Sequence, residues 1–245
     1  VWAKGRFRGE QMLYHSERIY GIDISKYQHV HKRRVYGIDW RNLRITRLGH
    51  TADRNALGAV DYPVSFVYIK STEGLTVFNP YYTQDVRAAR RYGFPVGAYH
   101  FFSTRPAMSQ ADYFLKKSRL RKGDLPPMLD VELSDRRIAA MGGRDVLFRE
   151  MLVWLKEVGR RSGTTPIIYV SQDFVNRYMP FAPEELKAYP VWVARYGEYK
   201  PYVHLLYWQL SPDGRVRGIQ GDVDIDVFNG SEEQFKRYLR AQTVK

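Results

Sequence analysis

The 245-residue sequence predicts a single α/β domain, in which a mainly parallel sheet or a barrel is surrounded by helices. Three observations support this prediction. Short runs rich in β-branched and aromatic residues recur along the chain, and amphipathic helical segments separate the earlier runs. The length suits one α/β barrel, and a 44% content of hydrophobic residues is enough for a sizeable core.

Eight segments have the composition of strands. They are residues 20–24, 65–70, 96–101, 128–132, 166–170, 191–194, 205–209 and 224–228. The last three are separated by turn-like stretches such as residues 211–214, which are too short for a crossover helix. A regular alternation of strand and helix therefore fits the first two thirds of the chain better than the last third.

Capping residues indicate where several helices begin and end. Asn79 is expected to be an N-cap with Pro80 at the first helical position, and Gly93 follows as the stop. Apolar residues recur at helical spacing over residues 144–161, which predicts the longest helix. Residues 231–234 have the pattern of a capping box, so we expect a terminal helix after them.

The formal net charge of +13 suggests a polyanionic partner: nucleic acid, an anionic membrane or an acidic wall polymer. A surface charged only for solubility explains the composition equally well. Residues 1–60 hold 12 Lys and Arg against 5 Asp and Glu, so much of the positive charge is concentrated there. The absence of cysteine excludes disulfides and a thiol nucleophile. No apolar run approaches the roughly 18 residues that span a bilayer.

Two acids stand two residues apart in the fourth predicted strand. Residues at this spacing face the same side of a strand, so Asp130 and Glu132 would project together, with Cα atoms about 6.5 Å apart. Two neighbouring carboxylates raise the pKa of one member, which suits a general acid. The alternative is an exposed strand end with two ordinary surface acids.

Further acids lie at the ends of the first and last predicted strands. These strands are neighbours in a closed barrel, so Asp23 and Asp224 would meet Asp130 and Glu132 over one opening. Four carboxylates there indicate a glycosidase-like or metal-dependent hydrolytic site. Asp226 fits better as a residue that caps or solvates an edge. The six histidines have no metal-ligand spacing, so neither a metal nor a cofactor is expected.

The residues around these acids resemble glycoside hydrolase family 25, the Chalaropsis-type lysozymes or muramidases. The run Tyr-Gly-Ile-Asp-Ile-Ser-Lys-Tyr-Gln at residues 20–28 looks like the opening of that family. Further matches follow in the correct order at residues 38–40, 66–74, 97–101, 129–132, 168–169, 191–196, 207–209 and 223–224. Residues 41–61 are longer than the equivalent family segment, and Asp226 stands where members often have Asn.

The resemblance implies an irregular TIM-like barrel of eight strands with about five helices, (βα)5β3, over residues 20–245. Residues 1–19 would be a basic N-terminal extension. The family cleaves the β-1,4 bond between N-acetylmuramic acid and N-acetylglucosamine in peptidoglycan, with retention. Glu132 would be the general acid/base with Asp130 assisting, and Asp23 and Asp224 match the other two acids of the cleft. A substrate-assisted route and an aspartyl nucleophile both remain open.

Several residues at or near strand ends are candidates for substrate binding. They are Tyr99, Tyr169, Trp192, Tyr196, Gln209, Lys70 and Glu73. The aromatic rings would stack on sugar faces, and the tyrosine hydroxyls need polar partners, which a cleft supplies. Lys70 and Glu73 would either form a structural ion pair or contact the glycan.

The resemblance to family 25 implies a muramidase that acts outside the cytoplasm on the glycan strands of peptidoglycan, and we expect it to be a monomer. Its signal or anchor would not be present in this chain. Nucleic acid is not an expected partner, because four acids at one opening would repel phosphates there. The basic N-terminal segment would contact the wall or a membrane surface. The alternatives are a hydrolase of another N-acetylated glycan such as chitin, and a catalytically weak wall-binding relative.

Overall fold

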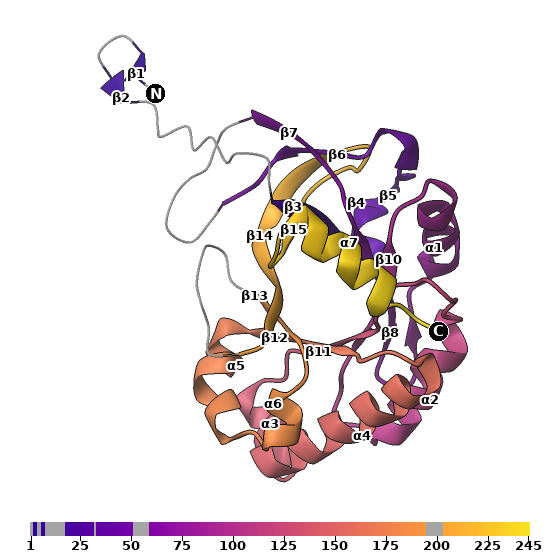
Figure 1. Cartoon of the computed structure of the whole chain (residues 1–245), viewed down its shortest axis with the longest axis vertical. Helices are drawn as coiled ribbons and strands as arrows, with labels where there is room; N and C mark the ends of the chain where they lie inside the picture. Colours follow the sequence, from indigo (N-terminus) through magenta and orange to yellow (C-terminus); the bar gives the residue numbers. More distant parts are fainter. Residues whose placement is uncertain (1, 4–5, 8–17, 32, 51–58, 195–202) are drawn as a thin grey trace.

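The computed structural model describes residues 2–3, 6–7, 18–31, 33–50, 59–194 and 203–245. Eight strands close into a barrel, seen in Figure 1 as a ring of arrows. In chain order they are β3 (Ile19–Ile24), β8 (Val67–Glu73), β10 (Val96–Phe101), β11 (Met128–Val131), β12 (Ile167–Ser171), β13 (Val191–Ala194), β14 (Leu205–Arg217) and β15 (Val223–Phe228). All are parallel to their neighbours except β15, which lies between β14 and β3 and is antiparallel to both.

Helices connect most of the later strands. The described residues form α1 (Tyr82–Arg91), α2 (Ala107–Ser118), α3 (Asp135–Ala140), α4 (Arg144–Ser162), α5 (Gln172–Arg177), α6 (Glu184–Lys187) and α7 (Glu232–Ala241). The shorter strands are β1 (Trp2–Ala3), β2 (Arg6–Phe7), β4 (Val30–His31), β5 (Arg34–Val35), β6 (Arg44–Arg47), β7 (Ala59–Pro63) and β9 (Val77–Phe78). None of the helices in the described ranges is long and apolar enough to cross a membrane.

Aromatic rings fill the interior of the barrel. Phe66, Tyr68, Trp192 and Tyr207 are fully buried and contact one another there. Gly21 provides the space for this packing, because a Cβ atom at that position would lie 2.3 Å from the ring of Phe66. The barrel is therefore a packed core rather than a channel.

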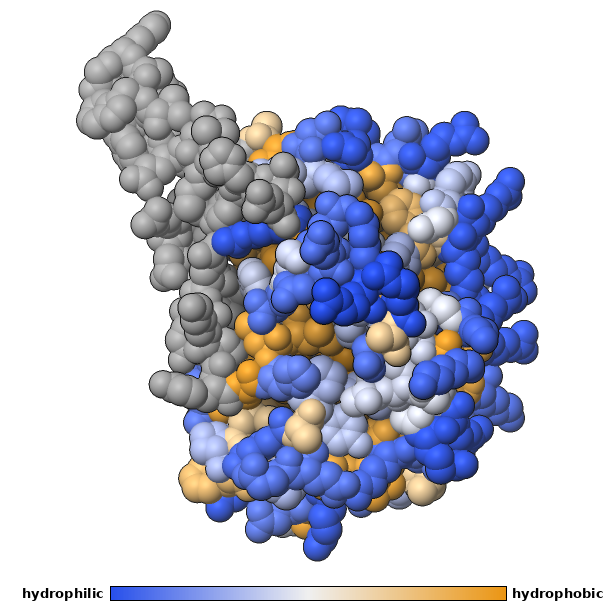
Figure 2. Space-filling view, in the orientation of Figure 1, coloured by the Kyte–Doolittle hydropathy of each residue, from blue (hydrophilic) through white to orange (hydrophobic). Residues whose placement is uncertain are grey.

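Helix α7 closes the end of the barrel that contains the amino ends of the parallel strands. It lies across the opening in Figure 1, and hydrophilic side chains cover it in Figure 2. On its inner side Phe235 is buried, with its ring centroid 5.8 Å from that of Phe66 and 5.0 Å from that of Phe228. The expected capping box is present, since Ser231 and Gln234 exchange both hydrogen bonds. This closure leaves the opposite end for a site.

The eight-strand irregular barrel is confirmed, and two local predictions are wrong. Residues 211–214 lie within β14 and not in a turn, because β14 extends to Arg217 and pairs there with β6. Helix α1 begins at Tyr82, so Asn79 is not its N-cap. The Asn79 side chain instead accepts a hydrogen bond from the Tyr81 backbone NH at 3.1 Å and donates to the Lys70 carbonyl at 2.9 Å.

The first crossover differs from the later ones. Between β3 and β8 the described residues form short strands and single 3-10 turns, with no α-helix among them. Strands β6 and β7 take the place of a helix against the outside of β3, where the rings of Tyr20 and Tyr62 stack at 4.9 Å. The extension of β14 supports this small sheet. Part of the long segment noted in the sequence therefore has a structural role.

Candidate active site

The open end of the barrel brings together the four acids that the sequence singles out. Asp23 of β3 lies directly opposite Asp224 of β15, Asp130 lies in β11, and Glu132 follows that strand. Burial is the largest cause that raises the pKa of Asp23, Asp130 and Asp224, and the charge of Glu132 raises all three further. We call these four residues the acidic cluster.

Asp23 is positioned by a chain of hydrogen bonds that crosses the barrel. The Gln209 amide donates to Asp23 Oδ2 at 3.2 Å, and the Tyr169 hydroxyl donates to Gln209 Oε1 at 3.2 Å. Burial raises the pKa of Asp23 to about 7, although the Gln209 hydrogen bond opposes the shift. Gln209 and Tyr169, which the sequence predicts to bind substrate, therefore position the carboxyl of Asp23.

Asp130 and Glu132 have different environments, although the charge of Glu132 acts on Asp130. Asp130 is buried, and its Oδ1 has no hydrogen-bond partner among the described residues. Burial raises its pKa well above the ordinary value, and the charge of Glu132 adds to this effect. Glu132 is more open to solvent. Desolvation raises its pKa as well, whereas the nearby Lys70 lowers it. The pair thus combines a buried carboxyl with an accessible one.

Asp224 completes the cluster on the side of β15. It is half-buried, and desolvation followed by the charges of Asp23 and Glu132 raises its pKa to about 9. Such a group is protonated near neutral pH. The acidic cluster therefore carries much less negative charge than four ionised carboxylates would.

A cation lies beside these acids. Lys70 Nζ is 2.8 Å from Glu73 Oε2 and 4.4 Å from the centroid of the Phe101 ring. Its charge lowers the pKa of both Asp130 and Glu132. The ion pair predicted for Lys70 and Glu73 is thus present, and it lies at the edge of the site.

The aromatic candidates lie at different depths. Tyr99 and Tyr169 are each 7% exposed, and their environment includes all four acids of the cluster. Trp192 is fully buried among the rings of the barrel interior, so the prediction that it stacks on a sugar is corrected: it belongs to the core. Tyr196 lies outside the described residues.

Asp226 is a buried acid whose position the sequence interpretation missed. It was expected at an edge, yet its side chain is fully buried. Neither carboxyl oxygen has a hydrogen-bond partner of normal geometry among the described residues. Burial raises its pKa well above the ordinary value, and the charges of Asp23 and Asp224 contribute. The spacing from Asp224, which places both on one face of β15, was the available signal.

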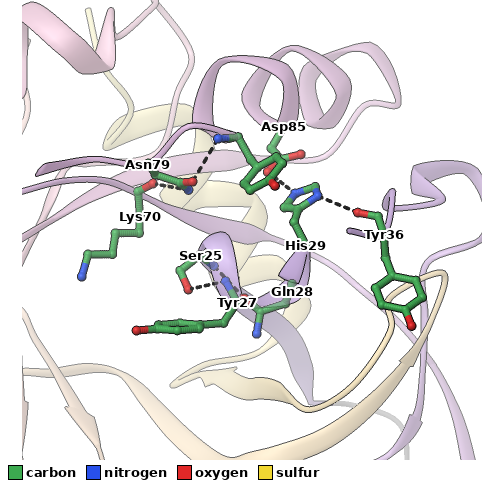
Figure 3. A network of polar contacts seen from close by, with 9 residues as sticks. Ser25, Tyr27, Gln28, His29, Tyr36, Lys70, Asn79 and Asp85 are labelled. Atoms are coloured by element: carbon green, nitrogen blue, oxygen red, sulfur yellow. Dashed lines mark hydrogen bonds and ion pairs between the residues drawn. The ribbon is translucent and has the colours of Figure 1, made fainter. Parts of the chain in front are cut away.

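The turn after Asp23 is held by a buried polar network (Figure 3). The Ser25 backbone NH donates to Gln28 Oε1 at 2.7 Å, and the Tyr27 NH donates to Ser25 Oγ at 3.3 Å. His29 Nε2 lies 2.7 Å from Asp85 Oδ2, and both side chains are buried. These contacts attach the turn firmly to α1.

The cluster has the groups that glycoside hydrolysis requires. An accessible carboxyl with a raised pKa suits proton delivery to a leaving oxygen, and neighbouring acids can stabilise positive charge on a sugar. No group of residues with the geometry of a metal site occurs in the described part of the chain. A surface hollow of about 660 Å³ between α4, α6 and α7 lies at the opposite end of the barrel, and no residue of the acidic cluster lines it.

Comparison with known proteins identifies the family. The family model "Glycosyl hydrolases family 25" matches residues 22–219. The chain belongs to glycoside hydrolase family 25. It is therefore a glycoside hydrolase, and the matched region contains Asp23, Asp130 and Glu132 but ends before Asp224.

Individual relatives agree with membership of family 25. The chain is 33% identical over 228 residues to "Uncharacterized protein YegX" of Escherichia coli (strain K12), covering 91% of this chain and 74% of the relative. It is 29% identical over 229 residues to "Lysozyme M1" of Streptomyces globisporus, covering 87% of this chain and 68% of the relative. The crystal structure of the bacterial lysozyme from Streptomyces coelicolor superposes with a TM-score of 0.70 at 27% identity, covering 88% of this chain and 94% of the lysozyme chain.

Proposed function

We propose that this family 25 enzyme is a muramidase that hydrolyses the β-1,4 bond between N-acetylmuramic acid and N-acetylglucosamine in peptidoglycan, with retention. The observation that carries the proposal is the pairing of the accessible Glu132 with the buried Asp130 at the open end of the barrel. Membership of family 25 and the similarity to proteins named as lysozymes support the choice of substrate.

In this proposal Glu132 is the general acid/base. Its raised pKa keeps a larger fraction of the carboxyl protonated near neutral pH, so it can protonate the glycosidic oxygen as the bond breaks. The resulting carboxylate then takes a proton from the water that completes hydrolysis. Lys70 limits how far the pKa rises, which keeps the ionised form accessible for this second step.

Asp130 assists and does not act as the nucleophile. Burial favours its protonated form, which is a poor nucleophile, and its carbonyl oxygen can accept a hydrogen bond from the acetamido N–H and so leave the acetamido oxygen free. The acetamido oxygen of the substrate would then attack the anomeric carbon, which gives retention without a covalent enzyme intermediate. Asp23, whose pKa of about 7 leaves it partly ionised near neutral pH, stabilises the positive charge that develops on the sugar, and the protonated Asp224 beside it offers a hydrogen-bond donor.

The proposed activity is tested with purified peptidoglycan. Wild type should release new reducing ends on N-acetylmuramic acid, and Glu132→Gln should lose on the order of 10²- to 10⁴-fold in rate. Asp130→Asn, which resembles the protonated acid, should lose less activity than Asp130→Ala. Equal release by wild type and Glu132→Gln would contradict the assignment. Release from chitin but not from peptidoglycan would show a different N-acetylated substrate.

We also propose that the enzyme acts as a monomer outside the cytoplasm, on glycan strands and not on nucleic acid. The net charge of +13 attracts anionic wall polymers, and the ionised fraction of the acids at the open end of the barrel still disfavours the closely spaced phosphates of nucleic acid there. Residues 1–19 would provide part of this attraction. Salt-dependent retention on DNA without retention on peptidoglycan would contradict this partner.

A further inference from the structure

The turn after β3, which follows Asp23 of the acidic cluster in the chain, carries an exposed aromatic ring. Tyr27 is 69% exposed, the largest exposed fraction among the large hydrophobic side chains that the structure describes. It lies only four residues after Asp23, in a turn that begins where β3 ends. Single exposed rings are ordinary on protein surfaces, so a function for Tyr27 must be argued from its position and its surroundings.

The backbone beneath Tyr27 is fixed by hydrogen bonds on both sides. Ser25 and Gln28 form a complete capping box around the turn. The Gln28 amide also donates to the Asp222 carbonyl at 3.1 Å, which connects the turn to the segment just before β15. Beyond the turn, the buried His29 and Asp85 side chains tie it to α1. An exposed ring on a well-fixed turn loses little conformational entropy when a ligand binds.

The ring extends to the same side of the turn as Lys70, away from the His29 and Asp85 pair (Figure 3). Lys70 acts electrostatically on Asp130 and Glu132, so this side is the side of the acidic cluster. Lys26 Nζ lies 5.4 Å from the centroid of the Tyr27 ring, and the remaining surface of the ring is open to solvent.

We propose that Tyr27 is a stacking platform for a pyranose ring of the glycan, at a position away from the bond that is cleaved. The axial C–H groups of a β-linked N-acetylated sugar form an apolar face, which packs on the electron-rich face of a tyrosine. Tyr27 is thus a substrate-binding residue that extends the site along the rim on the side of β3 and β15. This inference rests on the proposed muramidase function, because it assumes a glycan strand across the acidic cluster.

The test compares Tyr27→Ala and Tyr27→Phe with wild type on soluble peptidoglycan oligosaccharides of increasing length. Tyr27→Ala should raise KM on the order of tenfold on long oligosaccharides with kcat nearly unchanged, since the ring binds sugar but takes no part in the chemistry. Tyr27→Phe keeps the ring and should remain close to wild type. On the shortest oligosaccharide that is cleaved, all three proteins should have similar KM values, because the outer position is empty.

Tyr92→Ala is the matched control, because Tyr92 is a 43% exposed tyrosine at the end of α1. It should leave KM unchanged at every length. A Tyr27→Ala enzyme with wild-type KM on long oligosaccharides would overturn the platform while leaving the muramidase function intact. A loss in kcat alone would overturn it as well.

A second measurement separates failure of the platform from failure of the proposed function. Calorimetric titration of the same long oligosaccharide into Glu132→Gln, with and without Tyr27→Ala, needs no turnover. Weaker binding on the order of tenfold in the double variant would support the platform even if wild type cleaved nothing. Equal binding by the two proteins would refute it.

Discussion

Lys70 is the cation that opposes the effect of desolvation on the pKa of Glu132. Desolvation raises the pKa of Glu132 and Lys70 lowers it, so Lys70→Met should raise that pKa further. A general acid acts in its protonated form, and the alkaline limb of kcat/KM should therefore move to higher pH. Lys70→Arg keeps the charge and is the control. An unchanged alkaline limb in Lys70→Met would show that the charge of Lys70 does not affect the pKa of the general acid.

Asp226 is a second residue with a separable effect. Its carboxyl is buried without normal hydrogen bonds, and its folded pKa lies above the unfolded value, so the folded state loses stability as pH rises. Asp226→Asn should raise the free energy of unfolding at pH 7 by about 1–3 kcal/mol, with a smaller gain at pH 4. Urea unfolding at both pH values measures this. Asp145→Asn, at an 84% exposed side chain, should change stability by less than about 0.5 kcal/mol.

The sequence was sufficient to locate the acids but not to give their depth. Strand alternation places Asp130 with Glu132, and Asp224 with Asp226, on one face each. It does not distinguish the rim of a barrel from its interior, and for this reason Asp226 and Trp192 were misplaced. Depth depends on where neighbouring strands stagger and on which rings fill the centre. Both are set by residues far away in the sequence.

Among the elements, α7 makes a contribution that is easy to isolate. Phe235 joins the aromatic core at the closed end of the barrel, far from the acidic cluster. Phe235→Ala should lower the free energy of unfolding by about 3–5 kcal/mol, because it leaves a cavity among large rings. Lys236→Ala, on the exposed side of the same helix, should cost less than about 0.5 kcal/mol. Similar losses in both variants in urea unfolding would mean that α7 does not pack as described.

Element boundaries followed the sequence where local chemistry determines them. Helix α4 and the capping box at Ser231 are set by side chains within a few residues of each other, and both were predicted. The extension of β14 was not predicted. Its partner strand β6 lies more than 160 residues earlier in the chain, and the Pro-Asp-Gly sequence at residues 212–214 is typical of a turn. Tertiary pairing outweighed the local preference there.

At the scale of the whole molecule, a large net positive charge, formally +13, is combined with a site whose acids have raised pKa values. The net positive charge can therefore attract an anionic wall, while the raised pKa values weaken the repulsion between the acids of the site and the anionic substituents of the glycan. The same arrangement makes the stability of the fold depend on pH.

The window between about pH 7 and pH 9 is the clearest place to measure this dependence. Burial first, and then neighbouring acids, raise the folded pKa of Asp224 to about 9, whereas in the unfolded chain it ionises near pH 4; Asp23, with a folded pKa of about 7, contributes its loss mainly below this window. The folded state thus binds more protons than the unfolded state, so the free energy of unfolding falls as pH rises. Each carboxyl that stays protonated only in the folded state contributes a loss of about 1.4 kcal/mol per pH unit.

His100 acts in the opposite direction but outside that window. Burial lowers the folded pKa of His100 to about 4, whereas the unfolded imidazole has a pKa near 6.5. His100 therefore makes the free energy of unfolding rise with pH only between about pH 4 and pH 7. Urea unfolding at pH 7 and pH 9 should therefore show a clear decrease in stability, and Asp224→Asn should reduce the decrease. Equal stability at the two pH values would mean that the acids at the open end are ionised and hydrated. The protonated state of Asp130 used in the proposed mechanism would then be incorrect.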